Sequence, residues 1–303
     1  MATHDPLKAA ISDDVILIYC PYTDRDILEE DSSSEHIIPL ALGGANGLEV
    51  RVDAAFNSAL GSALDGKLAN EFFMAIRRTE YDARGHSGKE PWAISKNASY
   101  DDDTRPVQIH LHRRHGLKVW DVRDGEEKRG AGRIRFNTML NIDLPVRFTA
   151  KVGLAAGYFA YRDFFREYVD HHQLRQVMSI DPATLEGQES MGHAAADDVI
   201  ARVDHYLYEP PSESDWKLLA LRRFCSEVKG SVVVLVPGPN SFQVTVGILG
   251  QFLATIIVPA NTNSFPNEGD YHWGHQISVI KGNVVRSSWR DSMRRWVGDF
   301  MRG

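Results

Sequence analysis

The chain has 303 residues, of which 43% are hydrophobic and 25% are charged, with a formal net charge of -7. This apolar content is enough for a buried core, and the length favours two domains over one. No apolar run approaches the roughly 18 residues of a membrane span, and residues 1–14 lack a signal peptide's basic and apolar regions. We therefore expect a cytoplasmic protein without a membrane partner. Cys20 and Cys225 are too few for a disulfide framework or, alone, a zinc site.

Charge is distributed unevenly along the chain. Residues 1–50 contain ten acidic and two basic residues, whereas 105–135 contain nine basic and four acidic residues, and 281–303 contain six and two. The overall negative charge argues against nucleic-acid binding by bulk electrostatics, but local basic stretches can still contact phosphates. An ordinary solvated surface has the same composition, so both interpretations stay open. The candidate phosphate contacts are Arg113, Arg114, Lys118, Arg290 and Arg294.

The first quarter of the chain predicts two short extended segments followed by a helix. Residues 15–20 form an apolar run typical of a buried strand, and 36–42 form a second extended piece. We expect the Asp-, Glu- and Ser-rich stretch between them to be a loop and the glycines of 43–47 to form a turn. Helical spacing then runs from Asp53 to about Ile76. Its apolar positions are Ala55, Leu60, Leu64, Leu68 and Phe72.

The remainder predicts a mixed domain after a linker. Residues 91–105 are polar and include three consecutive aspartates, which favours a solvated linker between domains 1–90 and 106–303. Residues 107–122 alternate as a strand, and a helix begins near Pro145. Further elements are expected in the following order: a helix over 215–228, strands over 231–236, 242–249 and 252–258, a hairpin of 277–280 with 284–286, and a last helix opened by Ser288 and Asp291.

Chemistry is concentrated in the segment Ser34-Glu35-His36-Ile37-Ile38-Pro39, which Gly43-Gly44 follow, with Phe56-Asn57 and Gly61 further on. A neutral imidazole suits the deprotonation of water near neutral pH. A carboxylate and an amide oxygen are ligands that Mg²⁺ accepts, with water completing the shell. Because adjacent side chains on a strand point to opposite faces, Glu35 and His36 serve one site only if the strand ends or bends there.

This arrangement resembles the HNH endonuclease family, in the branch with an E-H-I-I-P…L-G-G signature and a later Asn and Gly. The resemblance covers about residues 15–75. It implies a ββα-metal unit in which Glu35 and Asn57 bind one divalent ion and His36 is the general base. It also implies that Asn46 orders the loop between the strands. The fold class that we expect is therefore α+β, with this unit followed by a larger mixed C-terminal domain.

One departure from the family concerns zinc. Many relatives hold this small unit together with zinc on two C-x-x-C pairs, but only Cys20 remains here. Thr23, Asp53 and Phe56 stand at the other three positions. Zinc sites of this type need four ligands, so we expect no structural zinc. Packing of Phe56, Tyr19 and Tyr22, against the second domain, is expected in its place.

The resemblance implies Mg²⁺- or Mn²⁺-dependent hydrolysis of DNA, with double-stranded DNA as the expected substrate and restriction or phage defence as the setting. One site cuts one strand, so a double-strand break needs a homodimer or two events. The alternative is a catalytically silent, nuclease-derived module that binds DNA or a partner protein. His110 and His112 share one strand face, as in some metal sites, but with no third ligand identifiable the favoured interpretation is a half-exposed strand.

Overall fold

The structure, a computed structural model, has helices and antiparallel sheets, which confirms the α+β class. No helix in the described part of the chain is long and apolar enough to span a membrane. The described residues are 15–100, 105–128, 133–136, 141, 143–179, 202–204, 216–266, 271 and 273–300.

A six-stranded antiparallel sheet is the centre of the molecule, with strand order β14-β13-β10-β11-β12-β9. Two tight hairpins connect its strands at Leu249-Gly250 and Lys281-Gly282, where all four residues have positive φ. Such turns match the right-handed twist of the flanking strands. The strands are β9 (Arg202–Asp204), β10 (Ser231–Gly238), β11 (Ser241–Ile248), β12 (Gln251–Pro259), β13 (His275–Ile280) and β14 (Asn283–Ser288).

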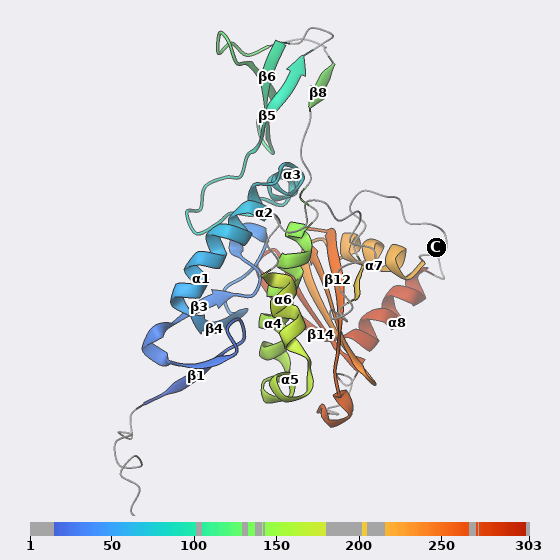
Figure 1. Ribbon diagram of the computed structural model, residues 1–303. Helices are drawn as coiled ribbons and strands as arrows, with labels where there is room; N and C mark the ends of the chain where they lie inside the picture. Colours follow the sequence, from blue (N-terminus) through green and yellow to red (C-terminus); the bar gives the residue numbers. More distant parts are fainter. Residues whose placement is uncertain are drawn as a thin grey trace, which may run out of the picture.

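Helices cover both faces of this sheet, so its central strands are continuous apolar runs rather than alternating ones. Val233 and Leu235 belong to the large core with α4 (Asp143–Tyr161), whereas Val232 and Val234 pack with α7 (Trp216–Glu227) and α8 (Trp289–Phe300). Figure 1 shows α4 and α6 on one side of the sheet and α7 and α8 on the other. Two shorter helices continue α4, namely α5 (Asp163–Tyr168) and α6 (His171–Met178).

The N-terminal segment packs beside α4. Its strands form two antiparallel pairs, β1 (Leu17–Cys20) with β2 (Arg25–Leu28) and β3 (Ser32–His36) with β4 (Glu49–Asp53). Asp53 caps the following helix by accepting the Phe56 N–H at 2.8 Å. The helical stretch consists of α1 (Ala54–Leu60), a π-helical turn (Gly61–Asp65), α2 (Gly66–Asn70) and α3 (Phe72–Tyr81).

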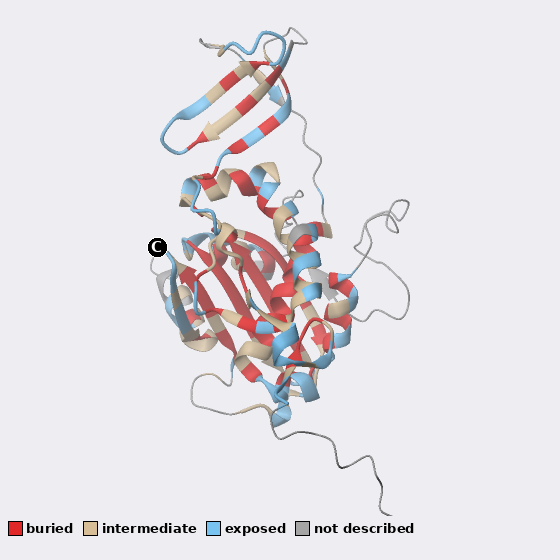
Figure 2. Cartoon of the chain, turned by 90° about the vertical axis from the view of Figure 1, so that its left-hand side faces the viewer, coloured by how far each residue is buried: buried red, intermediate tan, exposed pale blue. Residues whose placement is uncertain are grey.

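The third part is a small four-stranded sheet, which projects away from the rest of the molecule (Figure 1). Its order is β7-β6-β5-β8, and its own small core contains Ala98, Val107, Ile109 and Val119. In Figure 2 buried and exposed positions alternate along these strands, whereas strands β10 to β13 of the six-stranded sheet are mostly buried. The strands are β5 (Ala93–Tyr100), β6 (Arg105–His112), β7 (Gly116–Asp121) and β8 (Ile134–Phe136).

Most of the predicted elements are present, and four predictions differ. The Asp-, Glu- and Ser-rich stretch predicted as a loop contains β2 and most of β3. Residues 36–42 are not a strand: β3 ends at His36, and Leu40–Leu42 is a short 3-10 helix after Pro39. The range 91–105, predicted as a linker, contains β5, and the single strand predicted over 107–122 is the hairpin β6–β7. An apolar pattern does not predict β3 and β5, because these strands consist largely of small or polar residues.

The large core contains residues from both sides of the predicted domain boundary near residue 90. Ile37, Ile38 and Leu42 from the N-terminal segment lie in one cluster with Phe148 of α4 and Val246 of β11. The N-terminal segment is therefore packed against the C-terminal part through a shared apolar core.

Candidate active site

Strand β3 carries two of the three candidate catalytic residues, and they have different neighbours. Its ladder with β4 is regular through Glu35, opposite Val50, and His36, opposite Glu49. The strand ends at His36. Both side chains remain partly exposed, 15% for His36 and 13% for Glu35. Their contacts nevertheless form two separate sets, as strand alternation dictates.

His36 is oriented through one ring nitrogen. Its Nε2 lies 3.0 Å from Oδ1 of Asn46 and 3.1 Å from Oε1 of Glu49. Ser34 donates to the other carboxylate oxygen of Glu49. Both neighbours of Nε2 are acceptors, so Nε2 carries a proton; in a neutral ring the lone pair is then on Nδ1. Asn46, expected to order the loop, thus contacts the proposed base directly.

Glu35 points to a buried cation that the sequence motif does not contain. The Lys151 Nζ, on α4, lies 2.5 Å from Oε1 of Glu35 and 2.5 Å from Oδ2 of Asp65, which ends the π-helical turn. The Lys151 side chain is fully buried, whereas those of Glu35 and Asp65 are 13% and 14% exposed. Burial raises the pKa of Asp65, the ammonium of Lys151 opposes this, and Glu35 adds to it.

Tyr22 lies close to the same carboxylates. Its side chain is fully buried, and burial raises the pKa of its phenol well above the ordinary value, with Glu35 and Asp65 adding to the shift. The phenol therefore stays neutral and can donate a hydrogen bond. Within the described residues its hydroxyl has no hydrogen-bond partner.

Asn57 lies on the same side of β3 as Glu35. Its Nδ2 donates to Ser33 Oγ at 3.2 Å, and side chains two residues apart on a strand share a face. Among the described residues, Oδ1 of Asn57 and Oδ1 of Asp65 are buried without hydrogen-bond partners. Unpartnered buried acceptors are unusual and fit the hard oxygen donors that a divalent ion prefers. In the same described residues, no group of three or more His, Cys, Asp or Glu side chains is arranged to hold a metal ion.

The positions that bind zinc in many HNH proteins are packed or hydrogen-bonded. The Sγ of buried Cys20 accepts the Asp53 N–H at 3.3 Å, and the rings of Tyr22 and Phe56 are 6.2 Å apart. Tyr19 packs on Tyr158 of α4, with 4.9 Å between ring centroids. These are the expected aromatic contacts, including the one with the C-terminal part. The absence of zinc stays a prediction.

The basic candidates lie on other elements. Arg113, Arg114 and Lys118 belong to the β6–β7 hairpin, where Arg114 pairs with Glu90 at 3.1 Å. Arg290 and Arg294 lie on α8; Arg290 is 5.9 Å from the ring centroid of Trp273, and Arg294 is 4.0 Å from Asp291. Figure 1 shows the hairpin and α8 away from β3 and from each other. The two groups and the Glu35 site therefore do not form one continuous surface.

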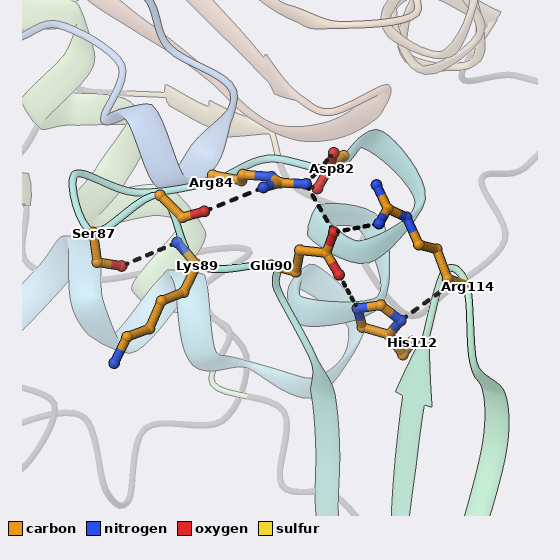
Figure 3. A network of polar contacts seen from close by, with 8 residues as sticks. Asp82, Arg84, Ser87, Lys89, Glu90, His112 and Arg114 are labelled. Atoms are coloured by element: carbon orange, nitrogen blue, oxygen red, sulfur yellow. Dashed lines mark hydrogen bonds and ion pairs between the residues drawn. The ribbon is translucent and has the colours of Figure 1, made fainter.

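His112 uses both ring nitrogens within the small sheet. Its Nε2 lies 3.1 Å from Oε2 of Glu90, and its Nδ1 accepts the backbone N–H groups of Arg114 and His115 at 3.1 and 3.3 Å. Figure 3 shows this network beside the turn of the β6–β7 hairpin. These contacts favour the structural interpretation of the His110 and His112 pair over a metal site.

The site contains residues that the sequence did not assign to it, namely Glu49, Asp65, Lys151 and Tyr22, the last of which was expected only as a packing residue. One signal was present: Lys151 interrupts the apolar stripe formed by Phe148, Val152 and Ala155. A comparison with known proteins adds no further residue. Protein-family models, curated proteins and solved structures were searched, and none matches the chain.

Proposed function

We propose that the protein is a metal-dependent nuclease of the HNH type, which hydrolyses phosphodiester bonds of DNA. The observation that carries this proposal is the orientation of His36 by Glu49 and Asn46 through Nε2. A base held in one tautomer by a carboxylate is a recurring catalytic arrangement. His36 and Glu35 flank the end of one strand, and both are partly exposed to a substrate there.

In this proposal the Nδ1 of His36 removes a proton from the attacking water. The water oxygen forms a bond to phosphorus as the bond to the 3′ oxygen breaks, which leaves a 5′ phosphate, and the 3′ oxygen takes a proton from solvent. Glu49 accepts the Nε2–H and stabilises the imidazolium as it forms. Glu35 and Asn57 would hold Mg²⁺ or Mn²⁺, which supplies charge neutralisation on the phosphate and the leaving oxygen.

The substrate class that we infer is double-stranded DNA, cut one strand at a time by each chain. A homodimer or two successive events would cut both strands. Basic groups of the β6–β7 hairpin and of α8 are candidate phosphate contacts, although Arg114 and Arg294 also have acidic neighbours. A setting in restriction or phage defence belongs to the same proposal.

The test is His36→Ala in a cleavage assay with Mg²⁺ or Mn²⁺. Loss of a positioned general base should lower the rate by roughly 10²-fold or more. The matched control is His172→Ala, because His172 is an exposed histidine on α6 and contacts Gln176 at 3.1 Å. Wild-type cleavage that His36→Ala does not slow would remove His36 as the base.

A second candidate is a catalytically silent module that binds DNA or a partner protein. The observation that favours it is the ion pair of Lys151 with Glu35, because the ammonium takes an oxygen that a metal would use. This candidate predicts that the wild-type protein binds double-stranded DNA without cutting it in either metal. Measuring binding and cleavage on the same labelled duplex separates the two functions.

A further inference from the structure

Lys151 is a charged residue in an unusual environment. It is fully buried on α4, and its Nζ lies 6.0 Å from the ring centroid of Phe148. Lysines are almost never fully buried unless they are paired, because removing an ammonium from water is unfavourable. The partners here, Glu35 and Asp65, lie 116 and 86 residues away in sequence, so only the tertiary fold assembles this cluster.

The cluster has more negative charge and more acceptors than one lysine satisfies. Two carboxyl groups face a single amino group, so the cluster has more acidic than basic groups. Its Nζ lies 2.5 Å from one oxygen of each carboxylate, so it sits where a bridging cation would sit. Within the described residues, the second oxygen of Asp65 and the hydroxyl of fully buried Tyr22 have no hydrogen-bond partners. Such an excess of unpartnered oxygen atoms is what a bound divalent ion would satisfy.

We propose that Glu35 and Asp65 together form a divalent-cation site and that the ammonium of Lys151 occupies this site when the ion is absent. Asp65 is then a second carboxylate ligand outside the sequence motif, and Lys151 is an internal competitor of the metal. Its role in a nuclease rests on the proposed function, but the exchange of ammonium for metal does not. The ion enters as the ammonium leaves, because both cations need the same carboxylate oxygens.

The first test compares Lys151→Met with the wild type. In EDTA the variant leaves two buried carboxylates without a counter-ion, so its melting temperature should fall. Millimolar Mn²⁺ should restore it, while the wild type should respond much less. Mn²⁺ binding, followed by electron paramagnetic resonance, should be at least roughly tenfold tighter in the variant, since the competing charge is gone.

Two further variants keep the test decisive if Lys151→Met is poorly folded in EDTA. Asp65→Asn keeps the lysine paired with Glu35 but removes a ligand, so Mn²⁺ binding should weaken by roughly tenfold or more. Asp65→Asn combined with Lys151→Met removes one charge of each sign; it should melt above Lys151→Met in EDTA and gain little from Mn²⁺. The matched control is Lys67→Met, because Lys67 is an exposed lysine on α2.

The result that overturns this proposal is Mn²⁺ binding in Lys151→Met and Asp65→Asn that equals the wild type, with no recovery of the melting temperature. Both measurements are made without nucleic acid, so they separate the two proposals. Metal responses as expected in a protein that cuts no DNA would support the cation site and refute the nuclease. If the wild type cuts DNA but the variants bind Mn²⁺ as tightly as the wild type does, the nuclease is supported and the cation site is refuted.

Discussion

Two networks of carboxylates and cations differ in how completely their polar atoms are satisfied. In the small sheet, Glu90 lies within 3.1 Å of nitrogen atoms of Arg84, Arg114 and His112 (Figure 3). Arg84 also pairs with Asp82 at 2.9 Å. Between α4 and the N-terminal segment, Lys151 is the one cation paired with two carboxylates among the described residues, and there one oxygen of Asp65 is without a partner.

Exposure makes the contrast sharper. Glu90 and Arg114 are 29% and 69% exposed, so water can replace any contact that they lose. Pairs of this kind contribute little to stability, typically below about 1 kcal/mol each. The fully buried Lys151 has no such replacement, and apolar residues in place of all members of a buried ion pair are often as stable as the ion pair itself. Stability alone therefore does not account for the Lys151 cluster.

The largest effect expected is on cleavage, from neutralising the carboxylate of Glu35. Glu35→Gln removes the charge that holds the metal ion and should slow cleavage by roughly 10²-fold or more, the size of losing one electrostatic stabiliser of a transition state. Glu90→Gln makes the same chemical change in the satisfied network and should leave the rate unchanged. Single-turnover cleavage of a labelled duplex measures both. Equal losses of cleavage rate in Glu35→Gln and Glu90→Gln would contradict the distinction between the two networks.

The next effect is on stability and comes from the Glu90 network. His112→Ala removes the contact with Glu90, the cap on two backbone N–H groups and the packing on Trp92, 4.2 Å away between ring centroids. A loss of about 2 kcal/mol in the free energy of unfolding is expected. Urea unfolding measures it. Cleavage by the folded fraction should stay at the wild-type rate, and a specific loss of activity would place His112 in the site.

A smaller effect is expected at Asn57. Removing its amide oxygen should raise the Mg²⁺ concentration for half-maximal cleavage by roughly tenfold, the lower end of what changes at a metal site produce. Mn²⁺, which binds such sites more tightly, should restore part of the rate. Asn57→Asp should need less metal than Asn57→Ala, because it still offers an oxygen. If Asn57 only caps the helix, Asn57→Ala should lower the melting temperature and leave the dependence of cleavage on metal concentration unchanged.

The parts of the fold with strong periodicity were predictable from sequence. The apolar runs of β10, β11 and β12 and the stripe of α4 gave the correct element types, because burial on both faces requires continuous apolar residues. Ser288 was also correct as the cap of α8, since its Oγ accepts the Asp291 N–H at 3.3 Å. The strands β2 and β3 were missed, because each is short and neither has an apolar alternation: β3 contains no apolar residue, and β2 contains only the adjacent pair Ile27-Leu28.

The candidate site likewise contains some residues that the sequence could predict and others that it could not. Glu35, His36 and Asn57 could be proposed from a local motif, since each lies within 22 residues of the others. Lys151 could not, because a lysine within an apolar helix commonly extends its stem along the core and its ammonium to water. Only the tertiary packing of α4 against the π-helical turn reveals that its ammonium is buried between two carboxylates. Long-range pairing of this kind has no signature in a single sequence.

The carboxylate of Glu71, by contrast with those of both networks, has no cation partner in the described residues. It interrupts the helix between α2 and α3, and its buried Oε1 has no hydrogen-bond partner there. It lines a cavity of about 560 Å³ that also involves Phe73, Met74 and Arg222. Burial raises the pKa of Glu71 to about 7; the backbone N–H of Asn141 opposes this, and Asp143 adds to it.

The smallest effect expected is the pH dependence that Glu71 imposes on stability. Its pKa is raised in the folded state, so the folded protein binds more protons than the unfolded chain between the ordinary value of 4.5 and about 7. Folding is therefore weakened as pH rises through that window. Glu71→Gln lacks this loss, so at pH 8 it should be more stable than the wild type by about 1 kcal/mol, allowing for solvent screening of a partly exposed group. At pH 4.5 the advantage should disappear.

Urea unfolding of both proteins at the two pH values measures the difference, with Glu80→Gln, at an exposed position of α3, as the control for net charge. If the stability difference between Glu71→Gln and the wild type is the same at both pH values, folding does not raise the pKa of the Glu71 carboxyl group.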